Sequence, residues 1–152
     1  MNFSINGYNG FIKVEISEVF GYPNRTSHLG GYETKSQLSI RSGGFSFEGK
    51  IWPSTGQIFQ FYQNLQKTYS CLQGETIFHC EFDPLFTLTY DSNGHLFIKG
   101  KFTERTEEWN LLEFEIRSDQ SYLVHTMAEL KQIVMKYGDD EGNIPPEPKE
   151  VC

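Results

Sequence analysis

The apolar residues of this chain change their period three times, and these changes limit the folds open to it. Over most of the sequence, apolar and polar residues alternate, as Ile12, Val14 and Ile16 do with their polar neighbours. Such alternation is typical of a strand with one buried face. Near Ser54 the period becomes helical, with Ile58 and Leu65 on one stripe. The chain therefore predicts strands interrupted by an amphipathic helix.

Both helices have recognisable ends. Ser54 and Gln57 have the spacing of a capping box, in which each side chain satisfies an amide of the first helical turn. A second helical stripe runs from Leu123 to Tyr137, with Ser118 or Asp119 as the cap at its start and Gly138 as the stop signal at its end. Two amphipathic helices are therefore predicted, one in the middle of the chain and one near its end.

The strand-like runs lie before and between these helices. Short polar turns at residues 42–44 and 91–94 join neighbouring runs, which favours antiparallel pairing. One further run, 76–82, carries the alternating residues Thr76, Phe78, Cys80 and Phe82. We therefore expect an α+β fold of order βββαββββα, a mainly antiparallel sheet of about seven strands with two amphipathic helices. Residues 1–138 form a single domain in this interpretation, and 139–152 a flexible, acidic, proline-rich tail.

Charge and composition narrow the class of partner. Aromatic residues make up 15% of the chain, which favours a sheet-rich fold because aromatics prefer strands. The formal net charge of −7 would repel a phosphate backbone, so no direct nucleic-acid binding is expected, whereas a basic protein partner would be attracted. No apolar run reaches the length of about 20 residues that spans a bilayer. The first ten residues do not resemble a secretory signal, so we expect a cytoplasmic protein without membrane contact.

The search for catalytic chemistry finds no motif. His28, His79, His95 and His125 are scattered, and none has a second ligand residue at metal-binding spacing. His79 and Cys80 are neighbours on a predicted strand, so their side chains point to opposite faces and do not form a nucleophile–base pair. The glycines of residues 21–32 lack the pattern of a phosphate-binding loop. We therefore expect no catalytic residues, no metal and no cofactor.

An acidic region near the end of the strands is the first candidate for binding a partner. Alternating carboxylates opposite an apolar face are also what keeps a half-exposed strand soluble, and Lys99 and Lys101 are expected across from them. The candidate residues of this acidic face are Glu104, Glu107, Glu108, Glu113 and Glu115.

The long loop at residues 21–32 is the second candidate. It holds Tyr22, Arg25, His28 and Tyr32, and aromatic residues with arginine are typical of interface anchors. The same loop contains Pro23 and paired glycines, so routing the chain between strands is an equal alternative.

Several segments resemble one known family. The runs FGYP and GGY near the first loop, STG before the first helix and SDQSY before the second occur in the order seen in the WapI family of bacterial immunity proteins. The resemblance covers roughly residues 10 to 138. It implies a cytoplasmic protein that protects a cell from the toxic C-terminal domain of a wall-associated, contact-dependent toxin, and it supplies no catalytic residues.

Three hypotheses follow from these observations. The first is a non-catalytic immunity protein that blocks a cognate toxin domain, with a basic nuclease-type toxin expected from the charge argument. The second is a small-ligand binding module with a pocket lined by aromatic residues. The third is a hydrolase, which needs two titratable side chains in one cleft, such as His79 or His95 with a carboxylate.

Overall fold

The computed structural model describes residues 1–105 and 107–146, with the side chain of residue 105 also outside the description. Over these residues the chain forms eight strands and two helices. In chain order they are β1 (Asn2–Gly7), β2 (Gly10–Phe20), β3 (Glu33–Ser42), β4 (Phe45–Ile51), α1 (Thr55–Cys71), β5 (Glu75–Cys80), β6 (Asp83–Tyr90), β7 (His95–Arg105), β8 (Trp109–Asp119) and α2 (Gln120–Tyr137).

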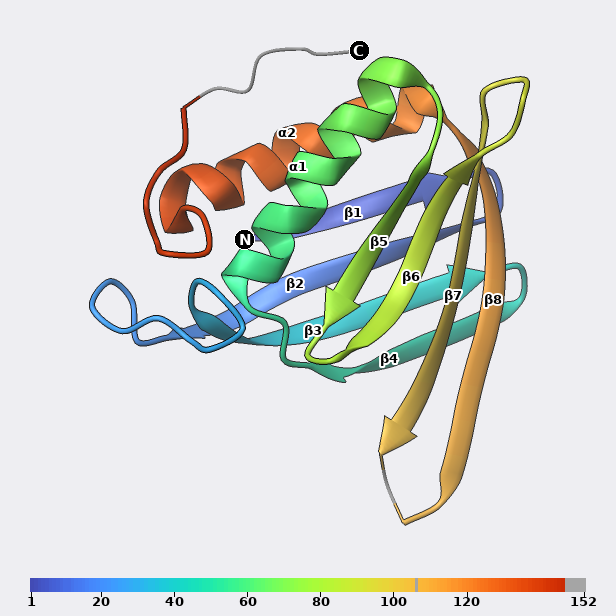
Figure 1. Ribbon diagram of the computed structural model, residues 1–152. Coiled ribbons are helices and arrows are strands. Elements are labelled where there is room, and N and C mark those ends of the chain that lie inside the picture. Colours follow the sequence, from blue (N-terminus) through green and yellow to red (C-terminus); the bar gives the residue numbers. More distant parts are fainter. Residues whose placement is uncertain (106, 147–152) are drawn as a thin grey trace.

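The strands form two antiparallel sheets of four, ordered β1-β2-β3-β4 and β5-β6-β7-β8. Each strand pairs with its neighbour in sequence, and in Figure 1 the strands of the second sheet run across the direction of the first. The predicted α+β class and its antiparallel pairing are confirmed. The expectation of one sheet with about seven strands is corrected to two sheets with eight.

The additional strand is β1, which contributes only two buried apolar residues, Phe3 and Ile5. Its outer edge pairs with α2 instead of with another strand. Ser4 donates its backbone N–H to Glu129 Oε1 at 3.1 Å, and Thr126 Oγ1 donates to the Ser4 carbonyl at 2.6 Å. A short edge strand satisfied by helix side chains leaves little periodic signal in the sequence.

Both predicted helix starts are confirmed. Ser54 Oγ accepts from the Gln57 N–H at 3.1 Å, and Gln57 Oε1 accepts from the Ser54 N–H at 3.1 Å, so the capping box is complete. Asp119 caps α2 by accepting from the Ser121 N–H at 2.8 Å, and Gly138 ends that helix with φ of 81°. The two helices lie side by side along one side of the sheets (Figure 1).

A cluster of phenylalanines joins the two sheets to α1. Phe3 of β1 packs against Phe61 of α1 and Phe78 of β5, with ring centroids 5.9 and 5.7 Å apart. Phe86 of β6 completes the cluster at 5.6 Å from Phe61 and 5.2 Å from Phe78. All four side chains are at most 1% exposed, so they form a shared core and not two separate ones.

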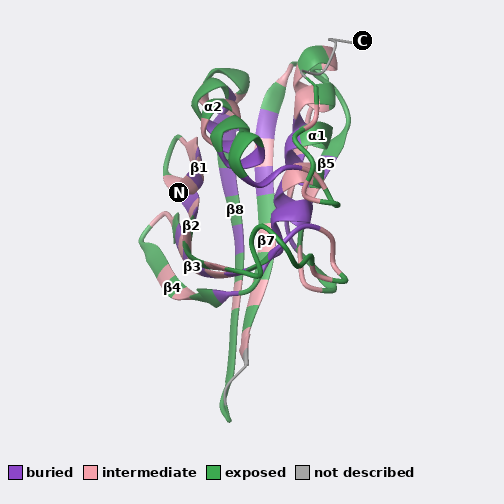
Figure 2. Ribbon diagram, turned by 90° about the vertical axis from the view of Figure 1, so that its left-hand side faces the viewer, coloured by how far each residue is buried: buried purple, intermediate pink, exposed green. Residues whose placement is uncertain are grey.

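The β7–β8 hairpin extends past this core. In Figure 2 its far end is exposed, whereas buried residues alternate with exposed ones in the part of β8 near the helices. Neither helix among the described residues has the length and apolarity needed to cross a bilayer.

The chain after α2 turns back on the domain. The Gly31 N–H donates to the Asp140 carbonyl at 2.6 Å, and Gln60 Nε2 donates to both carboxylate oxygens of Asp140 at 3.2 Å. The first residues of the segment expected to be a flexible tail therefore contact the first loop and α1. Residues 147–152 of that tail lie outside the described residues.

Candidate functional site

The predicted acidic face is divided between two sides of the β7–β8 hairpin. Glu113 and Glu115 lie on the outer side, in register with Lys101 and Lys99. Lys99 Nζ is 3.9 Å from Glu115 Oε2, so part of the negative charge on that side is balanced by the expected lysines.

Glu104 lies on the opposite side of the hairpin. Along β7, Lys101 and Thr103 are exposed, whereas Phe102 and Glu104 are half-buried. Glu104 and Phe102 line a cavity between β7 and the first sheet. Glu107 and Glu108 are exposed near the hairpin end. The five carboxylates therefore do not share one surface, and Glu104 is the one that faces a cavity.

The loop at residues 21–32 is held in place by three tyrosines. The ring of Tyr22 stands edge-on to Tyr32 and Tyr137, each at a centroid distance of 5.2 Å. Tyr32 is 3% exposed and donates its hydroxyl to the Pro23 carbonyl at 3.1 Å. Tyr32 thus lies inside the protein, where it joins the loop to the end of α2.

The other two residues singled out in this loop are accessible. Arg25 is exposed, and its backbone N–H closes the turn by donating to the Gly21 carbonyl at 2.7 Å. His28 is exposed as well, and its ring lies 6.3 Å from the ring of Phe82 in the turn between β5 and β6. The structure therefore brings His28, but not Arg25, to an aromatic neighbour from a distant part of the sequence.

An aromatic groove of roughly 730 Å³ lies between β4 and the second sheet. Its apolar lining comes from β4, the start of β6 and the second half of β7. Phe47 and Phe102 approach to 4.8 Å between ring centroids. Charged side chains of both signs surround these apolar residues. They are Lys50, Glu81, Asp83, Lys101 and Glu104.

A second cavity, the loop cleft, has a volume of roughly 340 Å³ and lies between the first loop and the β5–β6 turn. Trp52 and Glu81 line both this cleft and the aromatic groove, so the two cavities adjoin. The further residues that define the cleft are Phe20, His28, Leu29, Glu33, Thr34 and Phe82.

The β5–β6 turn that separates the cavities is fixed by a side chain of α1. Glu81 has a backbone φ of +57°, in the left-handed region that residues other than glycine rarely adopt. Gln57 donates from Nε2 to the Glu81 carbonyl at 2.7 Å and accepts from the Glu81 N–H at 3.2 Å. Gln57, which completes the capping box of α1, therefore also fixes the turn from which the side chain of Phe82 projects into solvent.

Sequence reasoning missed the main residues of this surface. The alternating run through Phe82 predicted an inward-facing strand residue, but β5 ends at Cys80 and Phe82 lies in the turn with 78% of its surface exposed. Trp52 was not singled out. It lies beside Pro53 in the short connection between a strand and a capping box, and connecting segments of this kind are exposed and often carry binding residues.

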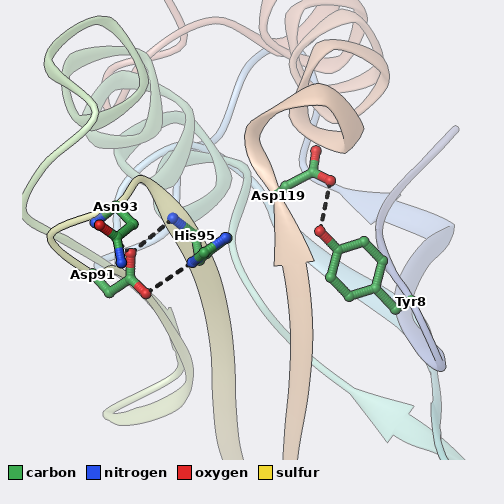
Figure 3. A network of polar contacts seen from close by, with 5 residues as sticks. All are labelled: Tyr8, Asp91, Asn93, His95 and Asp119. Atoms are coloured by element: carbon green, nitrogen blue, oxygen red, sulfur yellow. Dashed lines mark hydrogen bonds and ion pairs between the residues drawn. The ribbon is translucent and has the colours of Figure 1, made fainter.

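The titratable pairs outside this surface stabilise turns (Figure 3). His95 Nδ1 lies 3.1 Å from Asp91 Oδ2, while Asp91 Oδ1 accepts from the backbone N–H groups of Asn93 and His95. These hydrogen bonds outweigh the opposing effect of burial and lower the pKa of Asp91. The pair lines neither the aromatic groove nor the loop cleft.

A second polar contact connects the first hairpin to α2. Tyr8 donates its hydroxyl to Asp119 Oδ2 at 2.8 Å (Figure 3). Hydrogen bonds from Ser121 and from Tyr8 lower the pKa of Asp119, and the same contact raises the pKa of Tyr8. His79, the other histidine named for a hydrolase, is exposed on β5. Within residues 1–105 and 107–146, no group of three or more His, Cys, Asp or Glu side chains is arranged to hold a metal.

One comparison with known proteins gives a match. The model of the immunity protein WapI-like family matches residues 3–138, which is nearly the whole folded part of the chain. The searches of curated proteins and of solved structures returned no match.

Proposed function

Because the chain belongs to the immunity protein WapI-like family, we propose that it is a non-catalytic inhibitor that binds and neutralises a cognate toxin domain. The observation that carries the mode of action is the continuous surface made by the aromatic groove and the loop cleft. Exposed aromatic residues clustered around cavities are typical of protein-binding anchors, whereas isolated ones need no explanation.

Trp52 lies at the centre of this surface, since it lines both cavities and is 49% exposed. Glu104, from the predicted acidic face, lines the groove. His28, from the loop at residues 21–32, lines the cleft. The outer side of the β7–β8 hairpin is the weaker candidate, because its lysines balance its carboxylates. In this proposal the toxin contacts the groove and the cleft, and Glu113 and Glu115 on the outer side of the hairpin stay outside the interface.

The charge of the chain favours a basic toxin of the nuclease type. A formal net charge of −7 attracts a basic active-site cleft, and the inhibitor then occupies the place of the nucleic acid. Cytoplasmic action fits this role, because the toxin domain reaches its substrate inside the cell.

The aromatic groove supports a second candidate, a small-ligand binding module. Its volume of roughly 730 Å³ is within the range of about 300–1,000 Å³ found for small-molecule sites. Phe47, Trp52 and Phe102 provide the apolar lining, and charged groups stand at its rim. The family membership makes the toxin the first partner to test.

Co-expression tests the proposed function directly. The chain is expressed with the C-terminal domain of the toxin encoded beside its gene, and growth and complex formation are measured. We expect growth to be restored and the two proteins to be isolated together, with capture weakened as salt rises, because electrostatic attraction is screened. Growth arrest without a complex would exclude immunity to that toxin and would leave the ligand-binding hypothesis as the better one.

A further inference from the structure

The loop cleft differs from the aromatic groove in the sign of its charges. Glu33 and Glu81 are among the residues that line the cleft, and no lysine or arginine is among its described lining residues. The groove places Lys50 and Lys101 beside its own acids. The cleft is thus the part of the surface where an apolar lining and unbalanced negative charge occur together.

The aromatic residues of the cleft come from three separate segments. Phe20 ends β2, Trp52 follows β4 and Phe82 lies in the β5–β6 turn, and they are 45%, 49% and 78% exposed. Holding three large aromatic side chains in water around one cavity is unfavourable, since burying each would remove apolar area from solvent. A ligand that enters the cleft would therefore bury part of their exposed apolar surface.

The geometry of the cleft is fixed before a ligand arrives. Gln57 is 9% exposed and holds both backbone polar groups of Glu81, which keeps that residue in its left-handed conformation. On the opposite side, Glu33 begins β3 and accepts from Ser27 Oγ at 3.4 Å. A preformed site loses less conformational entropy on binding than a flexible one.

We infer that the loop cleft receives an arginine side chain of the partner protein. A guanidinium group is planar and stacks on aromatic faces, and it donates several hydrogen bonds to carboxylates, so it matches the combination of Phe82 and Trp52 with Glu33 and Glu81. The inference rests on the proposed function for the identity of the partner, since a basic toxin domain supplies such a side chain. The cation-binding chemistry of the cleft is testable without that partner.

The first experiment uses the full chain and N-acetyl-argininamide, with N-acetyl-citrullinamide as an uncharged probe of nearly the same shape. Binding is followed by NMR at the indole N–H of Trp52, which the Trp109→Phe variant assigns. We expect saturable shifts with a dissociation constant on the order of millimolar for the arginine probe and weaker shifts for citrulline. Equal shifts with both probes, or none with arginine, would overturn the inference.

The second experiment uses calorimetry to measure the dissociation constant for the toxin domain that is encoded beside the gene of this chain. The double variant Glu33→Gln with Glu81→Gln keeps side-chain size and one acceptor oxygen in each side chain but removes the charge. Glu113→Gln with Glu115→Gln removes the same charge from the outer side of the hairpin. We expect the dissociation constant to rise about tenfold or more for the cleft variant and less than about threefold for the control. Equal losses would contradict a specific cation site, whereas a wild-type protein that binds the arginine probe but no toxin would contradict only the proposed function.

Discussion

The side-chain amide of Gln57 spans both polar groups of the Glu81 backbone, with Oε1 3.2 Å from its nitrogen and Nε2 2.7 Å from its oxygen. The same Oε1 accepts from the Ser54 N–H at 3.1 Å. One buried side chain therefore completes the start of α1 and fixes the turn that presents Phe82. Local helix chemistry is in this way connected to the shape of the proposed binding surface.

Replacing Gln57 by alanine removes these hydrogen bonds and leaves backbone groups without partners. We expect the free energy of unfolding to fall by about 2–3 kcal/mol, measured by urea denaturation. Gln63 is exposed on the same helix, and its replacement by alanine is expected to cost less than about 0.5 kcal/mol. Equal effects of the two substitutions would show that the contacts of Gln57 contribute nothing.

Gly31 allows the first loop to approach the start of α1. A Cβ at this position would lie 2.3 Å from Thr55 Oγ1 and 2.5 Å from the Gly56 nitrogen, and its φ is +62°. Gly31→Ala is therefore expected to lower the free energy of unfolding by about 2–4 kcal/mol, because both the backbone and the packing must shift.

Gly44 is the matched control for this substitution. No atom lies within 4 Å of a Cβ built at Gly44, and its φ lies outside the left-handed region. Gly44→Ala should change stability by less than about 1 kcal/mol. A Gly31 variant as stable as the Gly44 variant would contradict the close approach.

The hydroxyl of Tyr32 is expected to stabilise the first loop through its bond to the Pro23 carbonyl. Tyr32→Phe removes only this bond and should lower the free energy of unfolding by about 1 kcal/mol. Tyr22→Phe keeps the same ring cluster, and its effect is expected to stay below about 0.5 kcal/mol. Thermal denaturation compares the stability of the two variants with that of the wild type. A Tyr32→Phe variant as stable as the wild type would contradict a stabilising role of the hydroxyl.

Asp119 and Asp91 make the free energy of unfolding depend on pH in the acidic range. Hydrogen bonds hold the pKa of each carboxyl below its ordinary value of 3.8, so each contributes stability that is present above that value. The contribution is lost as pH falls through the lower pKa of the folded state, where the carboxyl becomes protonated. Asp119→Asn should therefore lose less stability between pH 5 and the acid limit than the wild type does. Identical pH profiles from urea denaturation would contradict the role of this carboxylate.

Period and capping signals were enough to predict the α+β class, the antiparallel pairing and both helix starts. The capping box at Ser54 and Gln57 is local, so its residues report it directly. Strand β1 was missed because its outer edge is satisfied by Glu129 and Thr126, which are far away in the sequence. The division into two sheets was missed for a related reason, since short hairpins fix pairing between neighbours but not where a sheet ends.

The candidate surface depended even more on distant contacts. Lys99 and Lys101 were correctly expected opposite Glu115 and Glu113, because strand register follows from a short hairpin. The rings of His28 and Phe82 lie close together although the two residues are more than fifty positions apart in the sequence. Neither the loop nor the turn alone predicts this proximity. The interface roles of the acidic and loop residues stay predictions.

The most direct test of the central claim is calorimetric titration of the neighbouring toxin domain into the wild type and into two tryptophan variants. Trp52 lies in the proposed interface and Trp109 is 77% exposed at the start of β8, so each truncation removes one exposed indole. We predict that Trp52→Ala raises the dissociation constant by about tenfold or more, while Trp109→Ala changes it by less than about threefold. Loss of binding in the Trp109 variant with wild-type affinity in the Trp52 variant would contradict the account.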